Sequence, residues 1–575
     1  MKPQLGIISK FIFIACFWFG VITATRGADT NSSPAWPPLV AYGEHGMVAT
    51  VAPLATEAGV KVLKDGGNAI DAAVAVGLTL GVVDGANSGI GGGCFMLIRR
   101  ADGSIVALDG REMAPGAATR DMFIRNGKAD PELSQTGALA SGVPGSLAVY
   151  DYAETHFGKK NLKELILPAA EIADRGFVVS AGYARRLKAS AKDLWEFGAS
   201  REIYFKNSRQ TYGAGDTLRQ KDLAASYRHI AEEGVDWFYR GAFGAAVETW
   251  MKKNGGIVTA QDFRDYHILL REPVSTMYRG YEVVSFPPPS SGGVHVVEML
   301  NILEPFDLKK MDEVTRLHVI AEAMKLAFAD RAYWLGDPDF ANVPRGLVEK
   351  KYGAELAKKI NPEHTTVVPG HGLPPGWDKE FFKQHTTHFS VADAEGNWVA
   401  CTATVNTSFG SKVVIPGTGI VMNNQMDDFS AQPGATNYFK LIGAEANSVG
   451  PGKRPLSSMS PTIVLKDHQP ILALGAAGGP TIISQVLYAL VNILDMGMSP
   501  EDAMLQPRLH HQWSPDELMV EKTMPLKLRA ALAARGRAVG VTSAIGATQI
   551  VGRTKDGKEF VGVADPRASG EAKGW

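Results

Sequence analysis

The chain has 575 residues, of which 45% are hydrophobic, so it is long enough to bury one large core or several smaller ones. The 59 lysines and arginines nearly balance the 60 aspartates and glutamates, which gives no indication of a nucleic-acid surface or a polyanion binder. Three cysteines are few for an exported protein of this size that is stabilised by disulfides, so the fold must depend on its hydrophobic core.

The N-terminus has the pattern of an export signal. Two early lysines precede an apolar run over residues 11–22, and small residues follow as at a cleavage site, after either Ala24 or Gly27. We therefore expect a signal peptide over residues 1–28 and a periplasmic or secreted mature protein. The run is short for a membrane span, and an uncleaved anchor is the alternative.

Two helices are predicted between residues 47 and 83, with Asn68 as the cap of the second. The glycine-rich run at 88–93 leads into a strand rather than a helix, so it predicts a close-packed turn and not a phosphate-binding loop. Further along, strands are expected at 94–98 and 105–109, and mostly helices from 159 to 252.

Arg111 follows the second of these strands. A guanidinium at the exit of a strand is suited to bind a carboxylate through two parallel hydrogen bonds. The alternative is a surface arginine that pairs with a nearby acidic residue.

The second half of the chain is predicted to alternate helices and strands. Residues 367–378 are rich in proline and glycine and predict a flexible linker. A polar loop at 432–450 carries Tyr438 and Phe439 and is a candidate lid. Helices are expected at 294–303 and 315–335, a strand and turn within 417–429, and strands at 462–465 and 471–474.

A hairpin with an unusually polar face is predicted over residues 388–404. If residues 395–396 form the turn, Thr387 faces Thr404, whereas a slip of one residue places Thr386 opposite Thr404. Alternate positions on the return strand share one face, and here they are polar: Thr402, Thr404 and Asn406. A threonine-rich edge strand without a catalytic role explains the same pattern.

A threonine hydroxyl becomes a good nucleophile when a base lies beside it. An N-terminal threonine supplies its own base, because its α-amine has a reference pKa near ~8. Cleavage between His385 and Thr386, just after the linker, would create such a residue.

Gly478 and Gly479 lie between a strand and a helix, where free backbone N–H groups suit an oxyanion hole, although a plain tight turn is the alternative. No His-Glu-x-x-His motif occurs and the few histidines are scattered, so we expect no metal site. We also expect no cofactor.

Several motifs, in this order along the chain, resemble γ-glutamyltransferases (glutathione hydrolases). The resemblance extends over nearly the whole mature chain, from about Gly46 to Arg567. The motifs are G-G-N-A-I-D-A-A at 66–73, G-R-E-M at 110–113, T-T-H-F-S at 386–390, N-T-S-F-G at 406–410, N-N-Q-M-D-D-F-S at 423–430, R-P-L-S-S-M-S-P at 454–461 and the glycine pair at 478–479.

This resemblance implies an α/β (α+β) fold, namely the αββα four-layer sandwich of N-terminal-nucleophile hydrolases. It also implies a precursor that cuts itself into a large subunit, 29–385, and a small subunit, 386–575, which stay together as a heterodimer. Thr386 would be the nucleophile both in this cleavage and in turnover.

For the site, the resemblance implies that Thr404 hydrogen-bonds the nucleophile and that the N–H groups of Gly478 and Gly479 hold the oxyanion. The residues implied to bind the substrate α-carboxylate are Arg111, Ser457 and Ser458. Those implied to bind the α-ammonium are Asn406, Gln425 and Asp428. A zwitterionic head needs a cation and hydroxyls on one side and a carboxylate and amide oxygens on the other, so the set is chemically coherent.

The expected reaction is cleavage of glutathione and other γ-glutamyl compounds through an ester of Thr386, followed by transfer to water or to amino-acid or dipeptide acceptors. One alternative is an acylase on the same fold that acts on glutaryl β-lactams or poly-γ-glutamate; the complete ammonium site argues for an α-amino substrate. Another is an inactive binding relative, against which the retained Thr386 and glycine pair argue.

Overall fold

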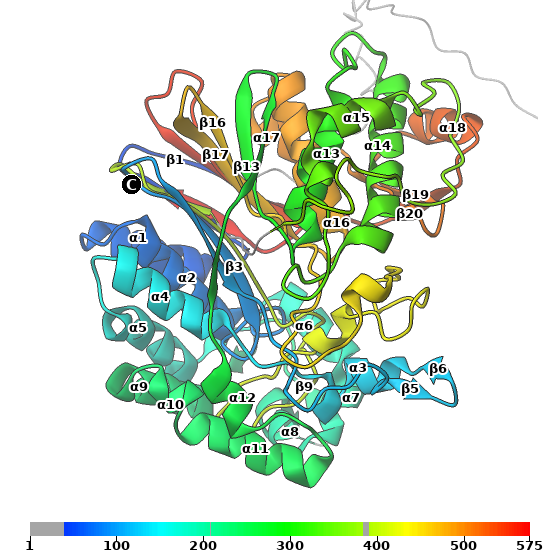
Figure 1. Ribbon diagram of the computed structural model, residues 1–575. Helices are drawn as coiled ribbons and strands as arrows, with labels where there is room; N and C mark the ends of the chain where they lie inside the picture. The colour runs from blue at the N-terminus through cyan, green and yellow to red at the C-terminus, as the bar shows by residue number, and fades with distance from the viewer. Residues whose placement is uncertain (1–38, 208, 383–389) are drawn as a thin grey trace, which may run out of the picture. The chain divides into compact units, whose positions relative to one another are not determined.

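Two antiparallel sheets of seven strands each lie at the centre of the computed structural model, which describes residues 39–207, 209–382 and 390–575 (Figure 1). All of these residues belong to one structural unit, Pro34–Trp575. The first sheet has the order β1 (Leu39–Gly43), β22 (Phe560–Ala564), β21 (Ala547–Arg553), β17 (Gln469–Ala477), β16 (Thr462–Lys466), β13 (Tyr281–Ser285) and β12 (Val274–Tyr278). The second has the order β11 (Leu269–Arg271), β4 (Ile105–Gly110), β3 (Gly93–Arg99), β15 (Trp398–Thr404), β14 (Ser390–Asp393), β2 (Gly46–Thr50) and β23 (Glu571–Gly574).

Helices cover the outer face of each sheet (Figure 1). On the second sheet lie α1 (Pro53–Lys64), α2 (Ala69–Val83) and α4 (Ser146–Phe157), with α5 (Leu162–Arg175) and α9 (Lys221–Glu233) packed behind them. On the first sheet lie α13 (Ser291–Leu303) and α16 (Thr481–Leu490), with α14 (Glu313–Trp334) and α15 (Lys350–Ala357) packed against α13. A separate hydrophobic cluster fills the space between the sheets. This order of layers confirms the predicted αββα sandwich.

The structure describes further α-helices and strands besides those in these layers. The remaining α-helices are α3 (Pro131–Gln135), α6 (Ala181–Ala189), α7 (Ala191–Glu196), α8 (Gly198–Tyr204), α10 (Asp236–Tyr239), α11 (Ala242–Asn254), α12 (Ala260–Asp265), α17 (Pro500–Leu505) and α18 (Leu526–Ala534). The remaining strands are β5 (Ile124–Arg125), β6 (Lys128–Ala129), β7 (Phe177–Val178), β8 (Phe205–Asn207), β9 (Gln210–Thr211), β10 (Thr217–Leu218), β18 (Leu509–His510), β19 (Leu518–Glu521) and β20 (Val539–Thr542).

Strand β15 contributes to two cores at once. Val399 and Cys401 pack with the helices on the outer face, whereas Trp398 and Ala400 belong to the core between the sheets. Because successive side chains of a strand alternate between its faces, Thr404 at the end of β15 continues the inter-sheet face. The predicted polar row therefore begins where the apolar core between the two sheets ends.

The β14–β15 hairpin has the register of the one-residue slip. Asp393 faces Asn397 rather than a residue further along, so the turn contains three residues, 394–396. The Asp393 carboxylate fixes this turn: it accepts hydrogen bonds from the backbone N (3.0 Å) and Nδ2 (2.9 Å) of Asn397 and from the backbone N of Ala69 (2.8 Å). The register expected from a turn centred on 395–396 is therefore wrong.

Most predicted elements are confirmed. Asn68 caps α2 in a reciprocal capping box with Asp71, as expected. In two places the structure differs from the prediction. Strand β2 precedes α1, where a helical region was expected from residue 47, and residues 417–429 contain the 3₁₀ helix Gln425–Asp428 instead of a strand. Gly417 and Gly419 have φ of 75° and 67°, which interrupts the extended backbone that a strand requires.

Candidate active site

The described site residues come from five segments, of which the first four are joined by direct contacts and the fifth is linked to them through the loop at 437–439. These segments are the exit of β4, the end of β15, the 3₁₀ helix at 425–428, the stretch 454–459 and the turn between β17 and α16. The two residues of the predicted cleavage, His385 and Thr386, lie outside the described residues.

Arg111 lies at the centre of these contacts and is 1% exposed. Its Nε donates to the carbonyl of Pro455 (2.9 Å) and its Nη2 to the carbonyl of Leu456 (3.1 Å). Nη2 also forms an ion pair with Asp428 Oδ2 at 2.5 Å. Arg111 therefore joins the exit of β4 to both the serine segment and the 3₁₀ helix, and the alternative of a surface arginine is wrong.

Two carboxyl groups flank Arg111, and burial shifts the pKa of both. Burial raises the pKa of Asp428 to about 6, and the positive charge of Arg111 opposes this shift. Burial likewise raises the pKa of Glu112 to about 8, again opposed by Arg111, whose Nη1 lies 3.5 Å from Glu112 Oε2. At pH 7 Asp428 is therefore mainly ionised and Glu112 mainly protonated, so Arg111 faces one negative charge rather than two.

Ser457 and Ser458 are buried side by side, and each hydroxyl oxygen accepts a hydrogen bond from the protein. Ser457 Oγ accepts from the backbone N of Met459 (3.1 Å), and Ser458 Oγ accepts from Arg331 Nη2 (3.2 Å). Arg331 comes from the last turn of α14. The predicted serine pair thus lies in the segment that Arg111 anchors, with a second buried arginine behind it.

Gln425 begins the 3₁₀ helix that ends at Asp428, and Asn406 is hydrogen-bonded to the residue just before that helix. Asn406 has φ of 79°; its backbone N donates to Thr404 Oγ1 (2.7 Å) and its Nδ2 to the carbonyl of Asn424 (3.0 Å). The side-chain oxygen of Gln425 is buried and accepts no hydrogen bond from any residue that the structure describes. A buried amide oxygen without a donor is suited to an incoming ammonium group.

Gly478 and Gly479 form the turn between β17 and α16, with φ of 144° and 59°. Neither backbone N–H donates a hydrogen bond to another residue within the described ranges. A Cβ on Gly479 would lie 2.6 Å from the Phe439 ring, whereas Tyr438 is 56% exposed. Phe439 is therefore the aromatic residue that covers the turn. Its neighbour Tyr438 connects this loop to the site, because its backbone N donates to Asp427 Oδ2 (2.9 Å).

Sequence reasoning missed Arg331 and Glu112 as parts of this region. Both have ionisable side chains in buried surroundings, and only their packing distinguishes them from the many ionisable residues on the surface of the chain. One signal was available for Arg331: it follows the apolar run Leu326–Ala329 on a helix that is buried over most of its length.

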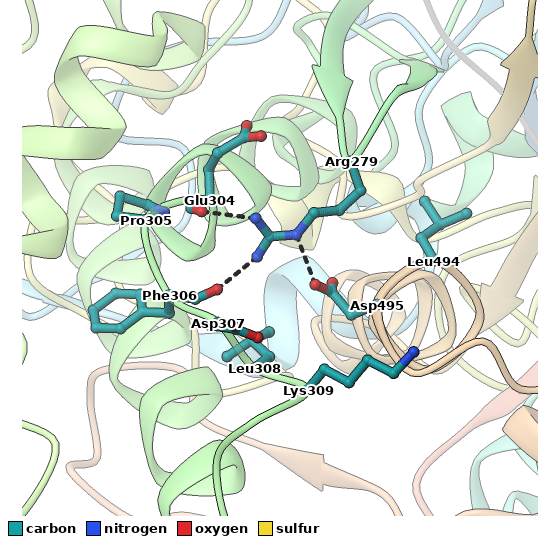
Figure 2. Close-up of a pocket in the computed structure, with 9 residues that line it drawn as sticks. All are labelled: Arg279, Glu304, Pro305, Phe306, Asp307, Leu308, Lys309, Leu494 and Asp495. Atoms are coloured by element: carbon teal, nitrogen blue, oxygen red, sulfur yellow. Dashed lines mark hydrogen bonds and ion pairs between the residues drawn. The ribbon is translucent and has the colours of Figure 1, made fainter.

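A cavity of about 370 Å³ is lined by other residues, and the arginine at its border has a structural role (Figure 2). Arg279 borders it, and its guanidinium donates to Asp495 Oδ1 (2.7 Å) and to the carbonyls of Glu304 (2.8 Å) and Phe306 (2.7 Å). These carbonyls follow the C-terminus of α13, where a cation is favourable.

Across residues 39–207, 209–382 and 390–575, no group of three or more His, Cys, Asp or Glu side chains is placed to hold a metal ion.

Known proteins with similar sequences and structures identify the family of this chain. The family profile Gamma-glutamyltranspeptidase matches residues 55–575. A glutathione hydrolase proenzyme of Escherichia coli (strain K12) is 44% identical over 564 residues, which cover 95% of this chain and 97% of that protein. An acylase ACY 1 proenzyme of Pseudomonas sp. (strain SE83) is 39% identical over 509 residues, which cover 87% of this chain and 88% of that protein. A crystal structure of cephalosporin acylase from Bacillus halodurans has a TM-score of 0.84 at 30% identity, over 96% of this chain and 99% of that one. The chain therefore belongs to the γ-glutamyltranspeptidase family of enzymes, which have the N-terminal-nucleophile hydrolase fold.

Proposed function

We propose that this enzyme cleaves the γ-glutamyl amide bond of glutathione and related compounds and passes the γ-glutamyl group to water or to amino-acid or dipeptide acceptors. The observation that carries the proposal is the buried ion pair between Arg111 and Asp428. A zwitterionic α-amino acid head is complementary to such a pair, because its carboxylate can bind the arginine while its ammonium binds the aspartate. Ser457 and Ser458 extend the carboxylate side, and Asn406 and Gln425 extend the ammonium side.

The proposed nucleophile is the hydroxyl of Thr386. Its own α-amine accepts the hydroxyl proton as Oγ attacks the γ-carbonyl, and the N–H groups of Gly478 and Gly479 stabilise the oxyanion. The leaving amine takes the proton and departs, which leaves a γ-glutamyl ester. Water or an acceptor amine then attacks the ester in the same way. The hairpin register supports this role from the described side: Ser390 pairs with Ala400, which is the slipped register under which the sequence predicts that Thr386 faces Thr404.

We also propose cleavage between His385 and Thr386 into subunits 29–385 and 386–575 that remain associated. The composition of the sheets supports this association. The second sheet places β3, from before the cut, directly beside β15, from after it, and the first sheet pairs β13 with β16. Separation of the subunits would expose the cores that these strands share, which is strongly unfavourable.

Incubation of the purified protein with glutathione tests the activity and the processing together. We expect two bands on a denaturing gel, with masses that match a cut before Thr386, and release of cysteinylglycine. Glycylglycine should divert part of the γ-glutamyl group into γ-glutamyl-glycylglycine. A persistent single band of full length would contradict the processing, and absence of glutathione cleavage by processed protein would contradict the substrate.

A second candidate function is deacylation of glutaryl compounds, which the similarity to acylases favours. A glutaryl group has no α-ammonium, so its carboxylate would bind at Arg111 without bringing a positive charge to balance the buried Asp428. We therefore expect γ-glutamyl-p-nitroanilide to be hydrolysed at least about 100-fold faster, in kcat/KM, than glutaryl-p-nitroanilide. Equal or reversed rates would favour the acylase function, and no hydrolysis of either would favour an inactive binding relative.

The raised pKa of Asp428 predicts that binding of the amino acid head weakens in acid. A carboxyl with a pKa of about 6 is charged above that pH and becomes neutral as the pH falls through it. The competitive inhibition constant of L-glutamate should therefore rise about tenfold per pH unit below pH 6. The variant Asp428→Asn has no such group, so its weaker inhibition should not change over the same range. The same acid dependence in both proteins would exclude Asp428 as its source.

Export is proposed from the pattern of residues 1–28, which lie outside the described residues. Among the helices that the structure describes, none has both the length and the apolar character needed to cross a membrane. Expression with its own N-terminus in a Gram-negative host, followed by mass spectrometry of the mature protein, tests the proposal. We expect a periplasmic or secreted product that begins after Ala24 or Gly27, and an intact N-terminus would contradict cleavage.

A further inference from the structure

Arg331 is a buried cation whose nearest partners are hydroxyl groups. It is 5% exposed, and it donates from Nε to Ser291 Oγ (2.9 Å) and from Nη2 to Ser458 Oγ (3.2 Å). Burial lowers the pKa of Arg331 to about 10, and the charge of Asp428 opposes this shift, so the guanidinium stays charged at neutral pH. It forms no ion pair with any carboxylate of the described residues. Burial of a charge whose hydrogen-bond partners are all neutral is energetically costly, so the position of Arg331 calls for a functional explanation.

The hydrogen bond from Arg331 makes the Ser458 oxygen an acceptor on that side and leaves its hydrogen to be donated elsewhere. A serine hydroxyl has one hydrogen, and an oxygen that accepts from a guanidinium keeps that hydrogen for another acceptor. The Ser458 hydroxyl donates to none of the residues that the structure describes, and the same is true of Ser457, whose Oγ accepts from Met459. Both serines are thus prepared to donate to a group that is not part of the described protein.

A second arm of Arg331 reaches Ser457 through Ser291. Ser291 Oγ accepts from Arg331 Nε and donates to the carbonyl of Ser457 (2.7 Å), and the backbone N of Ser291 donates to the same carbonyl (2.7 Å). The hydrogen bonds therefore run in one direction, from the guanidinium to the serine segment. Arg331 holds the hydroxyl of one serine directly and the backbone of the other through α13.

We propose that Arg331 is a positioning residue for the α-carboxylate of the γ-glutamyl substrate. It leaves the Ser458 hydroxyl hydrogen to donate to that carboxylate, holds the backbone of Ser457 in place through Ser291, and adds a second positive charge behind the one that Arg111 supplies. This inference rests on the proposed function, because it assumes a substrate with an α-carboxylate. It adds a residue from α14 that does not itself touch the substrate.

The test compares two substrates that differ only in the α-carboxylate: γ-glutamyl-p-nitroanilide and 4-aminobutyryl-p-nitroanilide. In Arg331→Gln we expect KM for the first to rise about 10- to 100-fold with kcat nearly unchanged, the usual effect of losing charge-assisted hydrogen bonds that act in binding. The value of kcat/KM for the second substrate should change less than about threefold. The matched control is Arg316→Gln, an arginine near the start of the same helix, which should leave both substrates unaffected.

Further variants separate positioning from general support of the fold. Arg331→Lys keeps the charge but not the two-armed fork, so its KM should lie between those of wild type and Arg331→Gln. In Ser458→Ala, the added substitution Arg331→Gln should cost less than it does in the wild type, because the two residues act through one hydroxyl. If neither arginine variant folds, as judged by thermal unfolding, Ser291→Ala removes the second arm and should still raise KM several-fold.

Equal losses on the two substrates, additive effects with Ser458→Ala, or an unchanged KM in a folded Arg331 or Ser291 variant would each overturn the proposal. A wild-type enzyme that does not hydrolyse γ-glutamyl-p-nitroanilide would instead contradict the proposed function, before any variant is made.

Discussion

Replacement of Thr386 by alanine is expected to leave a single full-length chain and to lower γ-glutamyl hydrolysis by at least about 10³-fold. Alanine has no hydroxyl to attack either the preceding peptide bond or the substrate, so both losses have one cause. A denaturing gel and the release of p-nitroaniline from γ-glutamyl-p-nitroanilide measure them on the same sample.

The matched control is Thr386→Ser, which retains a hydroxyl at the same position. It should still be cut and should keep measurable activity, with both steps slower than in the wild type. Cleavage of the alanine variant at the same bond would exclude Thr386 as the nucleophile of processing. Full activity in a correctly cut alanine variant would exclude it from turnover.

Replacement of Arg111 by alanine is expected to raise KM for γ-glutamyl-p-nitroanilide by about 10²- to 10³-fold, with a smaller effect on kcat. The guanidinium is the proposed partner of the α-carboxylate, and its loss also leaves the buried Asp428 without its ion-pair partner. Since Arg111 opposes the burial that raises the pKa of Asp428, that pKa should rise further, and the ammonium side of the site should weaken as well.

Arg111→Lys separates charge from geometry. A lysine retains one positive charge but cannot make all the bonds that Arg111 donates to Pro455, Leu456 and Asp428, so we expect an intermediate KM. Steady-state kinetics of folded, processed variants give the comparison. An unchanged KM in the alanine variant would remove Arg111 from the carboxylate site.

Much of the fold was accessible from local sequence. Asn68 followed by Asp71 specifies the start of α2, and the glycines at 91–93 mark a turn in which a Cβ on Gly91 would lie 2.0 Å from the Val421 carbonyl oxygen. The hairpin register was not fixed in the same way. Turn residues 394–396 suit more than one loop length, and the choice depends on Asp393, whose carboxylate also bonds to the backbone of Ala69 at the start of α2. This contact spans over 300 residues, so no local pattern contains it.

The sequence by itself determined the residue types of the proposed site and their order along the chain, because a nucleophile, a glycine turn and a zwitterion-binding set have recognisable chemistry. Only the tertiary structure decided how their charges act. Arg111 is buried between Asp428 and Glu112, and low solvation gives these two carboxyls different protonation states at pH 7. The tertiary structure also brought Arg331 from α14 to Ser458. Burial and the proximity of distant segments set a group's pKa and the direction of its hydrogen bonds, and both quantities exist only once the chain has folded.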